Sequence, residues 1–168
     1  MDDLDASKQR LRTRNLSLVF VKNSKVIFET DRGGLLGFLE AISELRDDLA
    51  EASVADRIIG KAAALLCAYS RVKAAFAVTL SDGGLSVLRD NHIPFEYGEL
   101  VPSIHNLERT DQCPFEKLVE NVNTPKEAYQ MITLACKRQS HTAPELHAAE
   151  NHIINCDASD LKDDHYSS

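Results

Sequence analysis

The sequence lacks several features that would define a function class at once. No uncharged stretch approaches the roughly 18 apolar residues that a membrane-spanning helix needs, which excludes a transmembrane protein. The first 15 residues alternate charges and contain no apolar core of a signal peptide. The four cysteines form no Cys-x-x-Cys pair. We therefore expect a cytoplasmic protein with reduced thiols.

Basic charge is also scarce. The 168 residues include 19 Lys or Arg and 26 Asp or Glu, giving a formal net charge of -7. Much of the acidic excess lies in residues 139–168, where Lys162 is the single basic residue. No basic stripe is present to neutralise phosphates, so we predict no binding to duplex nucleic acid. We interpret residues 1–14, with Arg10, Arg12 and Arg14, as a flexible solvated arm.

Alternating strand-like and helix-like segments predict an α/β domain over residues 15–138. Residues 16–21 and 26–30 are rich in β-branched and aromatic residues around a polar turn, which indicates a β-hairpin. Short apolar runs predict strands at 74–80 and 95–101. Apolar periodicity and capping residues predict helices at 35–49 and 54–70, from about 85, from 113 and at 124–138. Interleaved strands and helices predict a three-layer α/β/α sandwich with a mixed sheet.

The helix expected at 54–70 rests on its capping pattern. Ser53 is a suitable N-cap and Asp56 stands at the third helical position, as in a capping box. Lys61 is the only charged residue between 58 and 70, so this helix should be buried between layers. Gly60 within a helix costs about 1 kcal/mol relative to Ala, which close packing or a nearby ligand would explain.

The chain changes character after residue 139. Residues 141–150 are weakly helical, and the sequence from about 155 to 168 is acidic, polar and poor in core residues. We predict a C-terminal extension over 139–168 that is largely disordered from about 155.

Several strings resemble the domain of unknown function 1893 family. They are VFVKNSKVIFE, DRIIGKAAALL, LSVLRDNHIPFEYGELVP and CPFEKLV, and the resemblance covers about residues 15 to 135. It implies a cytidine deaminase-like fold. The family label implies no known activity.

The chemistry of zinc deaminases is absent from the matching positions. Those enzymes need a His-x-Glu or Cys-x-Glu on one helix and a Pro-Cys-x-x-Cys on the next, to hold zinc and move protons. The corresponding strings here are DRIIGK at 56–61 and SDGG at 81–84, which contain no such ligands. We therefore expect no zinc-dependent deamination, no metal site and no other cofactor. His141, His147, Glu150 and His152 lack the spacing of known zinc motifs, and we interpret them as surface residues.

A ligand-binding cleft is expected where helices begin after parallel strands. Backbone N–H groups at helix starts attract anions, Lys61 suits a phosphate, and Asp56 can accept hydrogen bonds from a ribose or base. Simpler interpretations remain open: Asp56 and Asp82 as helix caps, Lys61 as a surface-seeking side chain, and Gly60 as a packing residue. The predicted binding residues are Asp56, Gly60, Lys61, Ser81, Asp82, Asn106 and Arg109.

Cys113 is the second candidate for chemistry, beside Asp56. It stands at a predicted helix N-terminus, where the helix dipole stabilises a thiolate. The preceding loop contains His105 and Arg109, either of which can pair with a nucleophilic sulfur. The alternative is that Cys113 simply occupies the cap position before Pro114.

Three function classes follow from these residues. The favoured one is a deaminase-like domain without the zinc signatures that binds a nucleotide-like ligand in the residual cleft. The second is a metal-independent enzyme that acts on a nucleotide or nucleotide-sugar and uses Cys113 or Asp56. The third is a homodimeric protein-interaction module.

Overall fold

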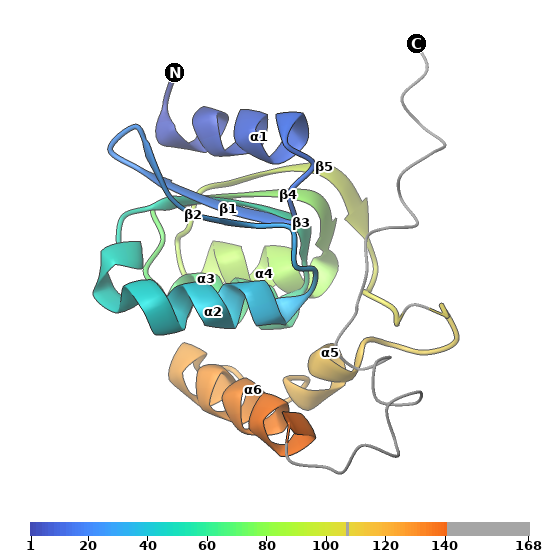
Figure 1. Ribbon diagram of the computed structural model, residues 1–168. Coiled ribbons are helices and arrows are strands. Elements are labelled where there is room, and N and C mark those ends of the chain that lie inside the picture. Colours follow the sequence, from blue (N-terminus) through green and yellow to red (C-terminus); the bar gives the residue numbers. More distant parts are fainter. Residues whose placement is uncertain (107, 141–168) are drawn as a thin grey trace.

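The computed structural model describes residues 1–106 and 108–140 and is built around one mixed sheet (Figure 1). Its five strands lie in the order β2-β1-β3-β4-β5. β1 is antiparallel to both of its neighbours, whereas β3, β4 and β5 are parallel. The strands are β1 (Leu18–Lys22), β2 (Lys25–Thr30), β3 (Ser53–Ile59), β4 (Ala74–Ser81) and β5 (Phe95–Val101).

Helices cover both faces of this sheet, which gives the predicted three-layer sandwich (Figure 1). One face carries α1 (Asp3–Thr13), and the other carries α2 (Leu35–Leu45), α3 (Lys61–Tyr69) and α4 (Asp82–Asp90). A 3-10 turn at Arg46–Leu49 follows α2. The last two helices, α5 (Pro114–Leu118) and α6 (Pro125–Ser140), lie outside the helical layer on the α3 side.

Residues 1–14 are not a flexible arm, and that prediction was wrong. Asp2 caps α1 by accepting a hydrogen bond from the Asp5 N–H at 2.8 Å. Leu11 is 1% exposed and packs with Leu16, Val19 and Phe76 in a second core cluster. Without α1 this face of the sheet would expose its apolar side chains to water.

The segment predicted as a helix at 54–70 is two elements. Ser53–Ile59 forms the strand β3 and only Lys61–Tyr69 is helical. The capping-box spacing of Ser53 and Asp56 misled the prediction. Val54 faces the larger core and Ala55 faces the α1 side, so the alternation of a strand covered on both faces determines the outcome. Asp56 is therefore a strand residue and not a helix cap.

The remaining elements follow the predicted order. The hairpin, β4, β5 and the helix preceded by Thr124-Pro125 all form where expected. The histidines at 141, 147 and 152 and most of the predicted extension lie outside the described residues. Among the described residues, no helix is long and apolar enough to cross a membrane.

Candidate functional site

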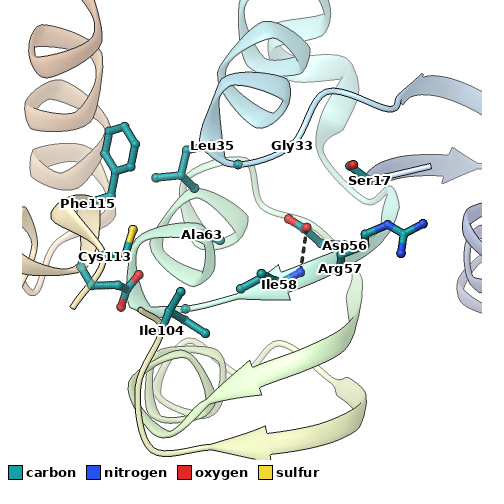
Figure 2. Close-up of a pocket in the computed structure, with 13 residues that line it drawn as sticks. Ser17, Gly33, Leu35, Asp56, Arg57, Ile58, Ala63, Ile104, Cys113 and Phe115 are labelled. Carbon is teal, nitrogen blue, oxygen red and sulfur yellow. Dashed lines mark hydrogen bonds between the residues drawn. The ribbon is translucent and has the colours of Figure 1, made fainter. Parts of the chain in front are cut away.

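A pocket opens at the carboxyl end of β3, below the start of α2 and facing α5 (Figure 2). β1 begins at Leu18, opposite Asp56, so the last residues of β3 extend past the end of that neighbour. The inner cavity measures about 50 Å³, within about 560 Å³ of empty space that includes the open mouth. The lining residues are Ser17, Gly33, Gly34, Leu35, Asp56, Arg57, Ile58, Gly60, Ala63, Ile104, Cys113, Phe115 and Glu116.

Asp56 is one of the charged residues that line this pocket (Figure 2). Its Oδ1 accepts one hydrogen bond from the Ile58 N–H at 3.2 Å. Burial among apolar groups raises the pKa of Asp56 to about 7, against the opposing effects of backbone N–H groups and of the Arg57 charge. The side chain remains partly exposed. It can therefore accept further hydrogen bonds and can change protonation near neutral pH.

Arg57 lines the same pocket, but its guanidinium is committed to the protein. Its Nε donates to the Leu16 carbonyl at 2.7 Å, and Nη2 donates to Asn15 Oδ1 at 2.5 Å. These bonds join the end of β3 to the turn after α1. Two of the five guanidinium donors are thus bonded within the protein, which fixes the orientation of Arg57 and leaves it less free to turn toward a phosphate.

Glu116 closes the side of the pocket that faces α3. Its two carboxylate oxygens accept from the Lys61 and Ala62 N–H groups at 2.9 and 3.0 Å. The carboxylate thereby caps the first turn of α3, where backbone donors have no helical partner. Burial raises the pKa of Glu116, although these two bonds and Lys61 oppose the rise.

The close approach of the Glu116 carboxylate explains why residue 60 is a glycine. A Cβ at position 60 would lie 2.7 Å from the Glu116 carboxyl carbon, so the Glu116 side chain would have to shift and lose its hydrogen-bond geometry to α3. Gly34 is a glycine for a different reason, which is its backbone conformation. It caps α2 with a φ of 71°, a conformation that favours glycine, and it brings bare backbone to the pocket.

Cys113 lies across the pocket from Asp56 (Figure 2). It is only 3% exposed and its sulfur is in a disulfide bond. This overturns the expectation of uniformly reduced thiols, because a disulfide sulfur is not a nucleophilic thiolate. Cys67 in α3 is a buried free thiol whose pKa is raised by burial and by the nearby Asp56 charge.

The structure brings only part of the predicted set together. Asp56, Gly60 and Cys113 share the pocket, whereas five other predicted residues do not line it. Lys61 turns outward, with its Nζ donating to the Glu120 carbonyl at 2.8 Å. The residues outside the pocket are Lys61, Ser81, Asp82, Asn106 and Arg109.

Those outside residues have structural contacts of their own. The Ser81 Oγ accepts from the Gly84 N–H at 3.0 Å and caps α4, which begins at the exposed Asp82. The Asn106 Oδ1 accepts from the Thr110 N–H at 3.1 Å and holds the loop closed. Arg109 stands in that loop with a φ of 54°. These predicted binding residues are therefore not gathered in the Asp56 pocket.

Glu116 and Arg57 were missed by sequence reasoning. Glu116 stands three residues after Cys113, at the spacing of a capping residue for its own short helix. It caps α3 instead, 54 and 55 residues away in sequence. Gly60 was the available signal, because an unexplained glycine indicates the close approach of another group.

No described group of three or more His, Cys, Asp or Glu side chains is placed to hold a metal ion. The chain has Gly60-Lys61-Ala62 at the start of α3 and Ser81-Asp82-Gly83 at the start of α4. The carboxylate of Glu116 occupies the first turn of α3.

Comparison with known families fits this architecture. The model of a family described as TM1506, domain of unknown function (DUF1893), matches residues 6–134. The chain belongs to the DUF1893 family. The matched span includes α1 from residue 6 and every residue that lines the pocket.

A solved structure of a DUF1893 family protein (TM1506) from Thermotoga maritima has the same fold. Its TM-score is 0.74 at 26% sequence identity, and the match covers 79% of this chain and 89% of that chain. RibD from Acinetobacter baumannii matches over 57% of this chain and 35% of its own, with a TM-score of 0.45 and 17% identity. No curated protein matches the chain. The predicted family and α/β fold class are thus confirmed.

Proposed function

We propose that this DUF1893 domain binds a nucleotide-like small molecule in the Asp56 pocket, through its base or nucleoside part. The observation that carries the proposal is Asp56 itself. It is a carboxylate inside an apolar-walled pocket that satisfies only one hydrogen bond from the described residues. Burying an ionisable group costs stability, and a carboxyl with a strongly shifted pKa in a pocket is a candidate functional residue.

The shape of the pocket favours a ring with polar edges. The walls include Leu35, Ile58, Ile104 and Phe115, which offer apolar contact to a flat ring. The inner cavity has room for only a few water-sized groups. We therefore expect the polar edge of a base to reach Asp56 while the rest of the molecule lies in the wider mouth.

Binding of a phosphate by Lys61 and the helix N–H groups, as expected from the sequence, has less support. The first N–H groups of α3 are bonded to Glu116, and Lys61 is bonded to Glu120. Arg57 uses its guanidinium on Leu16 and Asn15. With two carboxylates in the lining, a phosphate would meet repulsion inside the pocket. A nucleoside should therefore bind at least as well as its monophosphate.

Isothermal titration calorimetry with a panel of nucleosides and their 5′-monophosphates tests this proposal. We expect at least one nucleoside to bind, and Asp56→Asn to weaken it about tenfold or more through loss of a charge-assisted hydrogen bond. Asp82→Asn is the matched control, since Asp82 is exposed and outside the pocket. Absence of binding across the panel, or equal binding by Asp56→Asn, refutes the proposal.

An acid–base enzyme is the second candidate, and the pKa of Asp56 favours it. A carboxyl group that titrates near pH 7 is suited to accept and return a proton. The version that uses Cys113 as nucleophile has no such support, because that sulfur is in a disulfide bond. Incubating a bound nucleoside with the protein and measuring its mass over time separates an enzyme from a binding module. The homodimer stays a prediction, to be tested by native mass spectrometry.

A further inference from the structure

A second, larger groove lies at the opposite end of α2 and α3. Its volume is about 550 Å³, within the range of small-molecule sites. It shares no lining residue with the Asp56 pocket. At about 1.5 Å per residue, the helix from Leu35 to Arg46 separates the two by roughly 16 Å. The lining residues are Ile42, Ser43, Arg46, Asp47, Tyr69, Ser70, Arg71 and Tyr129.

Two arginines give this groove its charge. Arg46 follows the last residue of α2 and has no ion pair or hydrogen bond from its side chain among the described residues. Arg71 follows α3, and its Nη2 lies 3.1 Å from Asp47 Oδ1. The Asp47 side chain is 97% exposed, so this pair is weak and an incoming anion can replace it. A guanidinium matches the oxygen geometry of a phosphate.

Aromatic and hydroxyl groups complete the lining. The Tyr69 and Tyr129 rings, from α3 and α6, stack with centroids 4.2 Å apart and planes 13° apart. Both are partly exposed and line the groove, so a ligand ring can pack against this aromatic pair. Ser70 is 8% exposed, and its Oγ has no hydrogen-bond partner among the described residues. Ser70 thus brings a hydroxyl without a partner in the described part of the chain to the lining of the groove, and a hydroxyl can both donate and accept a hydrogen bond.

We propose that this groove is a second binding site, for a small aromatic or heterocyclic phosphate. The phosphate would lie between Arg46 and Arg71, and the ring would lie against the tyrosine pair. The two sites then differ in their balance of charge, since the first has two carboxylates and one guanidinium in its lining and the second has two guanidinium groups and one carboxylate. The inference does not depend on the function proposed for the Asp56 pocket.

Phenyl phosphate is the probe that tests both halves of the site, with inorganic phosphate and phenol as its parts. We expect saturable binding of phenyl phosphate to the full chain by calorimetry, tighter than either part alone. The double variant Arg46→Gln/Arg71→Gln should weaken it at least about tenfold, and added salt should weaken it too. Arg89→Gln is the control, because Arg89 is an exposed arginine that does not line the groove.

Tyr129→Leu separates the ring contact from the charge contact. It should reduce binding of phenyl phosphate but leave inorganic phosphate unchanged. Arginines near helix C-termini also stabilise helices, so the melting temperature of each variant is measured alongside. If folded Arg46→Gln/Arg71→Gln protein binds phenyl phosphate as tightly as the parent, or if the parent shows no saturable binding at millimolar concentration, the inference is wrong. Nucleoside binding to the Asp56 pocket should be unaffected by the double variant.

Discussion

Asp56→Asn should make the stability of the protein less dependent on pH. The folded chain raises the pKa of Asp56 from 3.8 to about 7 because the carboxyl is buried. Between these two values the folded state holds a proton that the unfolded state has lost. Stability therefore falls as pH rises from about 4 to about 7, and the penalty is constant above that range. Asparagine cannot ionise, so the variant escapes this penalty.

The magnitude follows from the size of the shift. Each pKa unit corresponds to about 1.36 kcal/mol, so a rise from 3.8 to about 7 sets an upper limit of about 4 kcal/mol. Asp56 is partly exposed to the pocket, and solvent there reduces the effect. We expect Asp56→Asn to gain about 2 to 4 kcal/mol relative to the parent protein between pH 4 and pH 8. In the variant, the Asn side-chain oxygen can still accept the hydrogen bond from the Ile58 N–H.

Urea unfolding followed by far-UV circular dichroism measures this difference, since the chain contains no tryptophan for a fluorescence readout. The quantity of interest is the difference in unfolding free energy between variant and parent at each pH. Taking the difference cancels the contribution of Glu116, whose pKa burial also raises. Asp82→Asn supplies the baseline for removing a carboxylate outside the pocket. A difference that stays flat from pH 4 to pH 8 would refute a buried, titrating Asp56.

Three further predictions concern the fold, two of them at the pocket and one on the α1 face of the sheet. Gly60→Ala should destabilise the protein by about 1 to 3 kcal/mol, since its Cβ meets the Glu116 carboxylate. Gly83 is the control, because it lies in α4 and a Cβ added there would be 3.4 Å from its nearest neighbour, which is an ordinary contact. Gly83→Ala should therefore be neutral or stabilising when both variants are compared by thermal unfolding. Glu116→Ala should cost about 2 to 4 kcal/mol by leaving two N–H groups of α3 unpaired, and Glu116→Gln should recover part of it. An unchanged melting temperature for Glu116→Ala would contradict the capping role. Leu11→Ala should cost about 2 to 5 kcal/mol in urea unfolding, whereas a flexible arm would tolerate it.

The elements that the sequence predicted well have strong local signals. The hairpin has β-branched runs around a polar turn, and the helix that begins at Pro125 follows a threonine cap with Glu127 in its first turn. The segment from 53 to 59 failed because local and tertiary signals disagreed. Ser53 and Asp56 fit a capping box, but pairing with β1 and β4 satisfies the backbone of a strand instead.

The helix α1 failed for a related reason. Its hydrophobic surface is narrow, with Leu4 and Leu11 on one side of a charged segment. Its burial depends on an apolar sheet face that the local sequence does not reveal. The site was predicted only in part for the same reason: Asp56 and Gly60 were identified from their own segment, but the contact of Glu116 with α3 joins residues more than 50 positions apart.

The two carboxylates of the pocket respond to the same burial but have different roles. Burial raises the pKa of both. Glu116 accepts hydrogen bonds from two backbone N–H groups at 2.9 and 3.0 Å, and these bonds stabilise the first turn of α3. Asp56 accepts one at 3.2 Å, from a neighbour within its own strand, and caps no helix. Truncation of Glu116 should therefore harm the fold by leaving two N–H groups unpaired, whereas replacing the Asp56 carboxylate with an amide should relieve it. Stability does not account for a carboxylate at position 56, and a ligand with donors on its edge would.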